Sequence, residues 1–426
     1  MTWNPVFNFI ISVKNQYIEK FNNFDPVEFT GFKNIVEKMV SELDNDFYKK
    51  IIQPLQINQW RTFVLLRYGR FSDIYGGEND ITPANFWNIH NGFYRECRSV
   101  VIDIEANKLV ITPFKKFHNI NEGEENSIDK IKERIKNAKS VEFADKIDGS
   151  MQCARYYNGK IVMAGSQAIN PENSWRLEEG YEIIYNNENY QKAIKHFSTK
   201  TLIFEFVNLK DQPVVRYDKS EEGLYLIGIR DIETGIQHSY EDVKNHAAMF
   251  NLKFAGIKNK TFTEIQEEIK ICSSDKKEGY VVNVDGFLFK MKCDDYVKMH
   301  RILSELSSPN LVLEHIRDNT FDDFMARVPE AYVDRVEEIA RNIFKYIRIY
   351  DQKTREYYYS LKNYNNKKEF MLLVEESVPK EFAHYVKNVY LYIVEDRYKC
   401  KNDFLRNKKY GDILAKLNNY ETRELI

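Results

Sequence analysis

The stretch EGYVVNVDGFLFKMK, residues 278–292, holds two short runs of β-branched and aromatic residues on either side of an Asp-Gly turn. This arrangement predicts a β-hairpin. Lys290 and Lys292 stand two residues apart in the second run, and alternate side chains of a strand share a face, so both amines should point the same way. Two ammonium groups on an otherwise apolar strand need an anion, and a phosphate is the natural candidate.

Similar short β-rich runs extend upstream to about residue 60, alternate with turns, and are not regularly separated by helices of the length found in βαβ units. They read TFVLLRY, RSVVID, KLVITPF, KIVMAGS, TLIFEFV and LYLIGIRD. The pattern predicts an antiparallel α+β domain rather than a doubly wound sheet. Upstream of these runs, residues 32–53 have apolar residues at helical spacing, and the first 60 or so residues read as mixed helix.

After about residue 297 the strand signal fades, and charged and aromatic residues recur at helical spacing. We therefore expect two domains, residues 1–296 and an all-α C-terminal domain over residues 297–426. The most basic stretch of this second domain, residues 397–412, carries Tyr398, Phe404 and Tyr410 among its Lys and Arg residues. That composition suits phosphate contact with base stacking, and it suits a solvated helix face equally well.

The composition, 43% hydrophobic and 30% charged over 426 residues, is that of a globular protein. A net charge of -2 gives no overall basic signature, so any nucleic-acid binding must come from a local cluster of cations. The five cysteines have no metal-binding spacing, which predicts free thiols in a reducing compartment. The N-terminus shows neither a secretory signal nor a membrane span, so we expect a cytoplasmic protein without membrane partners, in the host cytoplasm if it is viral.

The segment KIDG, residues 146–149, contains the other candidate for chemistry. A lysine amine becomes a nucleophile only when its pKa is lowered, and a Lys-Ile-Asp-Gly segment by itself is usually a turn with an exposed lysine. Two carboxylates follow it downstream. Glu205 interrupts an apolar strand, which is costly unless the carboxylate is paired or functional. Glu278 stands at the start of the hairpin described above.

In this order, KIDG, FEFV, LYLIGIRD, EGYVV and FKMK resemble motifs I, III, IIIa, IV and V of the covalent nucleotidyltransferases, which include RNA ligases, DNA ligases and mRNA capping enzymes. The nearest resemblance is to the RNA ligase 1 type, the tRNA-repair ligases of T-even phages and their relatives. ECRSVVID (96–103) and PFKKFHNINE (113–122) carry this narrower similarity, which covers about residues 90–300. The chain departs from the family pattern at Ser99, where the family has Gly, at His118, where it has an aromatic residue, and at Ala164, where it has Lys, which puts one phosphate contact in doubt.

The resemblance implies an antiparallel adenylyltransferase domain that uses ATP and Mg²⁺ or Mn²⁺. Lys146 would attack the α-phosphate of ATP to form a lysyl-AMP, and the AMP would then activate an RNA 5′-phosphate for attack by a 3′-hydroxyl. Lys290 and Lys292 would bind the α-phosphate and lower the pKa of Lys146. Glu278 would hold the metal.

The resemblance also assigns residues to the nucleotide. Glu205 would accept hydrogen bonds from the ribose, Ile227 would pack on the adenine, and Gly149 would let the backbone turn close to the nucleotide. Arg98 and Lys116 would reach the triphosphate or the RNA 5′-phosphate. The full nucleotide-binding set is Arg98, Lys116, Ile147, Gly149, Glu205, Ile227, Glu278, Lys290 and Lys292.

The implied partners are RNA with 5′-phosphate and 3′-hydroxyl ends, a cut tRNA among them, and a separate polynucleotide kinase-phosphatase that would prepare such ends for repair. A DNA ligase or an mRNA guanylyltransferase is the alternative within the superfamily. Both usually carry a β-barrel after motif V, where this chain has helix-rich sequence. A non-catalytic RNA-end-binding pseudo-ligase is the alternative from another class, although Lys146, Lys290 and Lys292 are all present.

Overall fold

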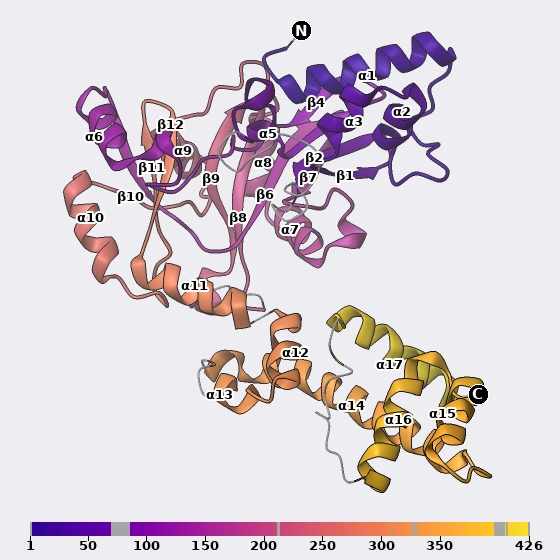
Figure 1. Cartoon of the computed structure of the whole chain (residues 1–426). Coiled ribbons are helices and arrows are strands. Elements are labelled where there is room, and N and C mark those ends of the chain that lie inside the picture. The colour runs from indigo at the N-terminus through magenta and orange to yellow at the C-terminus, as the bar shows by residue number, and fades with distance from the viewer. Residues whose placement is uncertain are drawn as a thin grey trace. The chain divides into compact units, whose positions relative to one another are not determined.

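The computed structural model of the chain describes residues 2–69, 86–210, 214–306, 308–325, 328, 330–395, 405 and 408–424. The chain separates into two compact units, Met1–Met299 and His300–Ile426 (Figure 1). In the described part of the first unit, three four-stranded sheets have the orders β1-β2-β3-β4, β10-β5-β11-β12 and β7-β6-β8-β9. All neighbouring strands in these sheets pair antiparallel, which confirms the predicted mixed helical and antiparallel architecture.

The strands span β1 (Leu55–Trp60), β2 (Phe63–Tyr68), β3 (Arg98–Asp103), β4 (Lys108–Ile111), β5 (Val141–Asp145), β6 (Ser150–Tyr157), β7 (Lys160–Gly165), β8 (Lys200–Val207), β9 (Gly223–Asp231), β10 (Ile257–Lys258), β11 (Gly279–Val284) and β12 (Phe287–Lys292). The helices of the first unit are α1 (Pro5–Phe21), α2 (Ile35–Leu43), α3 (Asp46–Ile52), α5 (Phe93–Glu96), α6 (Ile128–Lys136), α7 (Trp175–Tyr185), α8 (Glu188–His196), α9 (Tyr240–Met249) and α10 (Phe262–Ile271), and α11 (Asp294–Leu306) begins in it. Single 3₁₀ turns lie at Ile89–Gly92, Glu124–Asn126, Pro171–Asn173 and Lys219–Glu221.

Two of the sheets pack face to face. Leu65 and Val101 from the β1–β4 sheet meet Met151 and Ile203 from the β6–β9 sheet in one buried cluster. The opposite face of the first sheet is covered by α1, α2 and α3, and that of the second by α7, α8 and α9. Burial of apolar side chains on both faces of each sheet supplies the main stabilisation of this unit.

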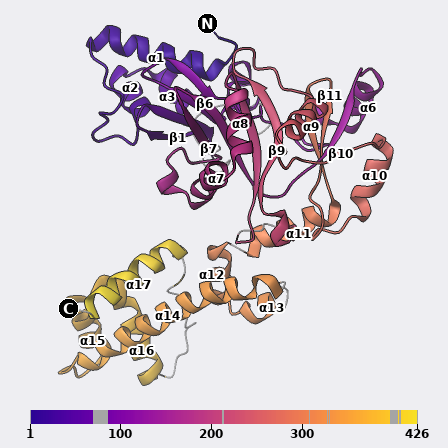
Figure 2. The same ribbon diagram turned by 180° about the vertical axis from the view of Figure 1, so that it is seen from behind.

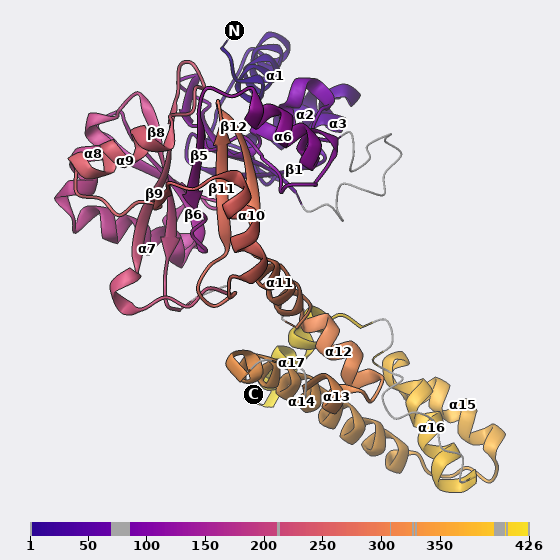
Figure 3. The ribbon, with the colours of Figure 1, turned by 90° about the vertical axis from the view of Figure 1, so that its left-hand side faces the viewer.

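The third sheet contains the two segments that carry most of the candidate chemistry. Figure 3 shows β5, β11 and β12 side by side, with β11 in the middle. Helices α6 and α10 contribute Ile131 and Ile265 to its buried core. The loop Lys146–Gly149 connects β5 of this sheet to β6 of the β6–β9 sheet, so it lies where the two sheets meet.

The hairpin predicted around Asp285 and Gly286 is present at residues 284–287, and an Asn-Gly hairpin lies at residues 157–160. Their central residues all have positive φ, 47° and 78° at Asn158 and Gly159, and 49° and 89° at Asp285 and Gly286. Asn-Gly and Asp-Gly favour this conformation, whose twist matches that of the flanking strands. The helical pattern of residues 32–53, in contrast, is divided into α2 and α3, because Asp44 adopts a left-handed conformation with φ of 53°.

In the described residues of the second unit, the chain forms helices α12 (Pro309–Arg317), α13 (Phe321–Met325), α14 (Glu330–Ser360), α15 (Lys367–Ser377), α16 (Lys380–Glu395) and α17 (Tyr410–Glu424). Figure 2 shows α14 beside α16 and α17, and Ile343, Val386 and Ile413 are among their buried residues. Of the helices described in the two units, none combines the length and the apolarity needed to span a lipid bilayer.

Candidate active site

Lys146 is held at the junction of two sheets by its own backbone. Its amide N–H donates to the Gly279 carbonyl oxygen at 2.9 Å, which ties the KIDG segment to the first residue of β11. Gly279 has φ of 144°, and a Cβ atom on it would lie 2.1 Å from the Met291 carbonyl oxygen of β12. The glycine of the EGYVV segment is therefore required for β11 and β12 to approach closely beneath Lys146.

The Lys146 amine is paired with a carboxylate from the hairpin. Its Nζ lies 2.6 Å from Glu278 Oε2, and Lys292 Nζ lies 2.9 Å from Glu278 Oε1. The Glu278 side chain is only 3% exposed. Lys290 and Lys292 follow the predicted alternation on β12, because Phe289 and Met291 between and beside them are buried in the core.

Lys290, the other lysine of β12, has cations rather than a carboxylate as its charged neighbours. Burial and the positive charges of Arg98, Lys116, Lys146 and Lys292 lower the pKa of Lys290 to about 6. Arg98 Nη1 is buried and makes no hydrogen bond. Such a cluster of buried cations costs free energy unless an anion binds to it. The cluster is therefore best explained as a binding site for a phosphate.

Phe117 forms the floor that Arg98 and Lys290 share. The Arg98 guanidinium and the Lys290 Nζ each lie 5.1 Å from the centre of its ring, within cation–π distance. The main chain beside it runs along β12, since Lys290 N–H donates to the His118 carbonyl oxygen at 2.9 Å. Sequence reasoning did not assign a role to Phe117, although the PFKKF segment contained it.

The predicted effect of Lys290 and Lys292 on the Lys146 pKa is wrong for this structure. Burial alone would lower the pKa of Lys146, but the negative charges of Glu278 and Glu205 outweigh it and raise the pKa above its ordinary value. Two carboxylates from β8 and the start of β11 surround the amine, and no local spacing in the sequence revealed this. The group whose pKa falls strongly is Lys290.

The two carboxylates differ in their ionisation. Burial raises the pKa of Glu205 to about 7. Burial would also raise the pKa of Glu278, but the charges of Lys146 and Lys292 keep it below its usual value. Glu278 is thus ionised at neutral pH, whereas the pKa of Glu205 is raised toward neutrality.

The carboxylates also decide whether a divalent metal fits. Among the residues that the structure describes, no group of three or more His, Cys, Asp or Glu side chains is placed to hold a metal. Mg²⁺ commonly binds through one or two carboxylates together with substrate phosphates and water. Glu278 and Glu205, whose pKa the Glu278 charge helps to raise, are such a partial set. The residues present therefore fit a metal that arrives with a nucleotide.

A narrow cavity of about 90 Å³ connects these groups. Its lining includes six of the predicted site residues, namely Arg98, Lys146, Ile147, Glu205, Ile227 and Lys290. Tyr240, Ala255 and Val281 add apolar walls. Ligand pockets are commonly about 300–1,000 Å³, so side chains such as Phe117 must move to admit a nucleotide.

The other predicted residues lie around this cavity. Gly149 faces the β8 backbone, where a Cβ would lie 2.4 Å from the Phe206 carbonyl oxygen, so close strand packing explains the glycine. Lys292 and Glu278 stand behind Lys146 as the ion pairs described above. Lys116 lines a separate cavity, and its Nζ lies 5.2 Å from the centre of the Trp87 ring.

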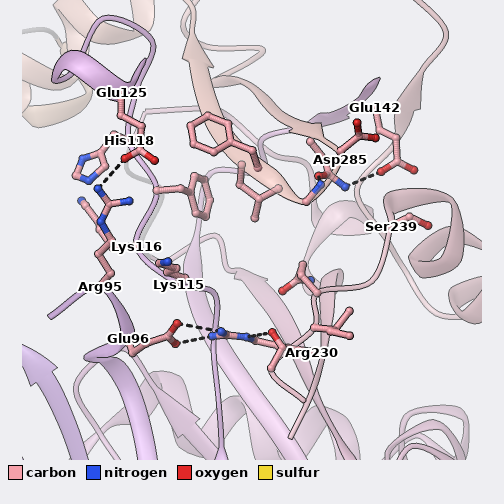
Figure 4. Close-up of a pocket in the computed structure, with 18 of the residues that line it drawn as sticks. Arg95, Glu96, Lys115, Lys116, His118, Glu125, Glu142, Arg230, Ser239 and Asp285 are labelled. Carbon is pink, nitrogen blue, oxygen red and sulfur yellow. Dashed lines mark hydrogen bonds and ion pairs between the residues drawn. The ribbon is translucent and has the colours of Figure 1, made fainter. Parts of the chain in front are cut away.

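That separate cavity is larger, about 630 Å³ (Figure 4). Two ion pairs join four of its charged side chains. The Arg230 guanidinium binds both Glu96 oxygens at 2.8 and 3.1 Å, and Arg95 binds Glu125 at 2.7 Å. Lys146 lies outside this cavity, as do Glu205, Glu278 and Lys290. Its buried Glu96–Arg230 pair instead links the ECR segment to the LYLIGIRD strand, a contact that spans 134 residues.

The aspartate of KIDG has a structural role that the sequence did not reveal. Asp148 Oδ2 accepts hydrogen bonds from the Val214 and Val215 N–H groups at 3.1 and 3.0 Å, and its Oδ1 accepts one from the Tyr296 hydroxyl at 2.9 Å. Its carboxylate therefore clamps the loop after β8 and the helix after β12 onto the Lys146 loop. These three bonds use both acceptor positions of Oδ2 and one of Oδ1, so the carboxylate mainly holds the loop in place.

The three departures from the family pattern have local explanations. Ser99 has φ of 73°, a conformation that favours glycine, and its hydroxyl donates to the Ser166 carbonyl oxygen at 2.7 Å. The His118 ring packs edge-on against Trp87 at 5.4 Å, as a packed aromatic residue would. Ala164 is buried in the core between two sheets, so no cation points into the site from that position.

The prediction that the cysteines are free is wrong for two of them. Cys272 follows α10, Cys293 follows β12, and a disulfide joins them. Twenty-one residues separate them, so only the return of the β11–β12 hairpin toward the end of α10 brings the pair together. Cys97 and Cys153 are buried free thiols, and Cys400 lies outside the described residues.

Comparison with known proteins gives a family for the central part of the chain. Residues 96–297 match a family model described as RNA ligase. A protein of Thermovibrio ammonificans provisionally assigned as an RNA ligase is 27% identical over 267 residues, which cover 59% of this chain and 67% of that protein. A protein of Autographa californica nuclear polyhedrosis virus, provisionally assigned as a bifunctional polynucleotide kinase/RNA ligase, is 26% identical over 275 residues, 58% of this chain but only 37% of its own length.

Solved structures of a Naegleria gruberi RNA ligase are also similar. One, a mutant with ATP and Mn, is 18% identical with a TM-score of 0.33 and covers 40% of this chain and 55% of that one. Another, with PPi, has the same identity and TM-score over 44% of this chain and 57% of that chain. The matches thus span just over half of these solved chains.

Proposed function

The chain belongs to the RNA ligase family, of the RNA ligase 1 type, through residues 96–297, and on that premise we propose that it is an ATP-dependent RNA ligase. It would join the 5′-phosphate and 3′-hydroxyl ends of RNA in RNA repair. One observation carries the proposal most directly. The Lys146 amine, paired with Glu278, shares a cavity with the basic side chains of Arg98 and Lys290, a combination suited to binding a phosphate.

In the first step, Lys146 Nζ attacks the α-phosphorus of ATP. A P–N bond forms, the bond from that phosphorus to the bridging oxygen breaks, and pyrophosphate leaves. Lys290 and Lys292 stabilise the charge that develops on the α-phosphate, since catalysis at phosphorus is mostly positioning and electrostatic stabilisation. The amine must lose its proton before it attacks. The negative charge of Glu278 raises the pKa of Lys146 and so opposes this loss, and another positive charge must therefore neutralise Glu278.

A divalent ion such as Mg²⁺ or Mn²⁺ at Glu278 would supply that positive charge when bound, and it would polarise the phosphate oxygens. Glu205, whose pKa is raised toward neutrality, is suited to hydrogen bonds with the two ribose hydroxyls. Ile147 and Ile227 provide apolar contact for the adenine. Arg98 and Lys116 bind the β- and γ-phosphates and, after pyrophosphate leaves, the RNA 5′-phosphate.

In the second step an oxygen of the RNA 5′-phosphate attacks the AMP phosphorus, and the P–N bond to Lys146 breaks. In the third, the 3′-hydroxyl of the acceptor attacks the RNA phosphorus, a phosphodiester forms, and AMP leaves. The cations around Lys290 serve all three displacements, because each develops charge on a phosphoryl group at about the same place.

Self-adenylylation tests the proposal. The protein incubated with α-labelled ATP and Mg²⁺ or Mn²⁺ should carry label through a denaturing gel, and chelation of the metal should prevent it. Transfer of the label to a 5′-phosphorylated RNA and closure of that RNA should follow. Label from GTP would instead indicate a guanylyltransferase, sealing of DNA but not RNA would indicate a DNA ligase, and no label at all would leave an RNA-end-binding pseudo-ligase.

We further propose that the helical part, residues 300–426, selects the RNA, with a cut tRNA as one candidate substrate. Residues 397–412 were the predicted basic contact, and most of them lie outside the described residues. A truncated chain ending near residue 306 should still self-adenylylate, because the described residues of the candidate site precede Met299.

The measurement for this second proposal is the ratio of sealing rates on a nicked stem-loop RNA and on a single-stranded RNA. Truncation should lower the ratio several-fold, once circular dichroism and self-adenylylation show that the shortened protein is folded. An unchanged ratio would assign the helical part to another role. The ends of a cut RNA need a 5′-phosphate and a 3′-hydroxyl, so a polynucleotide kinase-phosphatase is the enzyme class expected to act before this one.

A further inference from the structure

A groove of about 720 Å³ begins where the KIDG loop ends. Ser150 and Met151, the first residues of β6, line it. Met151 also lines the cavity of about 90 Å³ that contains Lys146, here called the nucleotide cavity. The groove is thus separated from the candidate active site by the width of a side chain. It was not singled out by any sequence motif.

The lining of this groove suits a polyanion that also carries hydrogen-bonding bases. Its charged residues are the cations Lys33 and Arg176, and no Asp or Glu is among the described residues that line it. Most of the remaining polar lining is amide or hydroxyl, as in Asn58, Asn170 and Asn173. A chain with 64 acidic residues and a net charge of -2 does not give an acid-free groove of this size by default.

The groove is lined in part by the aromatic side chain of Trp175, called the platform below. Trp175, the first residue of α7, is 39% exposed, so part of its ring is open to a ligand. The Arg176 guanidinium lies 4.7 Å from its ring, and Lys210 Nζ, which forms an ion pair with Glu179, lies 5.7 Å from it. An exposed aromatic ring flanked by cations is the arrangement on which unpaired bases stack while their phosphates are neutralised.

The platform is fixed to the strand that leaves the catalytic loop. Gln152 of β6 is 1% exposed, and its Nε2 donates to the Arg176 carbonyl oxygen at 2.5 Å. Gly180 makes room for it, since a Cβ there would lie 1.9 Å from Gln152 Oε1. The start of α7 is therefore anchored two residues from Ser150, and a base stacked on Trp175 would be held at a set distance from Lys146.

We propose that this groove binds the 3′-hydroxyl end of a single-stranded RNA, the acceptor strand of the ligation, with a terminal base stacked on Trp175. The inference rests on the proposed ligase function and specifies one of its substrates. A 3′-hydroxyl end has no terminal phosphate, and the groove accordingly offers stacking and amide groups. The concentrated positive charge that a 5′-phosphate needs lies in the nucleotide cavity, at Arg98 and Lys290.

A neighbouring cavity is larger than the groove, but its lining is less suited to RNA. That cavity, about 1140 Å³, is lined by four carboxylates, Asp103, Glu172, Glu178 and Glu182, and by two cations, Arg61 and Lys160, so its net negative lining suits a phosphate backbone less well. Tyr185 lines it, lies at the far end of α7 from Trp175, and is 57% exposed. Tyr185→Ala is therefore a matched control, because it removes an exposed aromatic ring from the same helix.

The test compares Trp175→Ala, Trp175→Phe and Tyr185→Ala in the full-length protein. Sealing is measured with a pre-adenylylated donor RNA and a separate 3′-hydroxyl acceptor. Trp175→Ala should raise the KM for the acceptor about tenfold, as loss of one base stack does, and leave the KM for the donor unchanged. Trp175→Phe should recover most of the affinity. Tyr185→Ala should behave as wild type, and self-adenylylation with ATP should be equal in all four proteins.

An increase in the donor KM, or no change in the acceptor KM, would overturn the assignment. Binding of a fluorescent single-stranded RNA with a 3′-hydroxyl, measured without ATP, separates this inference from the ligase proposal. If wild type forms no lysyl-AMP, the ligase proposal fails, yet a tenfold loss of RNA binding in Trp175→Ala alone would still support the groove. Equal RNA binding by Trp175→Ala and wild type would remove the groove from consideration.

Discussion

Lys146→Ala is expected to form no covalent adduct with AMP and to seal no RNA from ATP. Two other amines belong to the site, those of Lys290 and Lys292. Lys290 is in the phosphate cluster and Lys292 is already paired with Glu278 at 2.9 Å. The check is label from α-labelled ATP after a denaturing gel, followed by peptide mapping of the adduct in wild type. Sealing of pre-adenylylated RNA should survive in part, because that substrate bypasses the first two steps.

Lys146→Arg separates nucleophilicity from charge. Arginine keeps a cation beside Glu278 but does not lose its proton in proteins, so it should also form no adduct while preserving stability better than alanine does. Lys192→Ala, which breaks an exposed ion pair with Glu188 on α8, is the surface control and should adenylylate normally. An adduct in Lys146→Ala that maps to another lysine would refute the mechanism.

Replacement of Lys290 by Ala or Met is expected to reduce self-adenylylation by about 10²–10³-fold, the usual effect of removing one group that stabilises transition-state charge. Lys290→Arg should recover only part of this, because a planar guanidinium replaces a point charge in a tight cavity. The single-turnover rate of adduct formation at saturating ATP is the measurement. Full activity of the arginine variant would contradict the tight phosphate site.

The lowered pKa of Lys290 also predicts a pH dependence with a definite sign. With a pKa of about 6, most of the Lys290 side chain is neutral at pH 7 to 8, and a bound phosphate favours the charged form. ATP binding should therefore take up a proton, and the affinity should fall as the pH rises above 6, by at most tenfold per pH unit for one proton.

Calorimetry of ATP binding in buffers with different ionisation enthalpies measures this proton directly. Wild type should take up close to one proton at pH 7.5, and Lys290→Met and Lys290→Arg should take up much less, since neither side chain titrates there. Proton uptake that is the same in wild type and Lys290→Met would show that another group is responsible.

Much of this protein was determined locally by its sequence. Strand alternation in residues 279–292 placed Lys290 and Lys292 on one face, and the Asn-Gly and Asp-Gly pairs specified two hairpin turns. These features depend on period and on the φ preferences of single residues, which neighbouring positions suffice to set. The order of the short motifs around Lys146 likewise indicated the family before any fold was known.

What depended on tertiary structure is the set of contacts between elements distant in the chain. Lys146 and Glu278 are 132 residues apart, and Glu96 and Arg230 are 134 apart, so their pairing follows from strand order and sheet packing and not from spacing. The disulfide between Cys272 and Cys293 and the anchoring of Trp175 beside Ser150 have the same origin. The direction of the Lys146 pKa shift also depends on tertiary structure. It is set by the distance of each charge from the amine and by the depth of burial, and both are defined only in the folded chain.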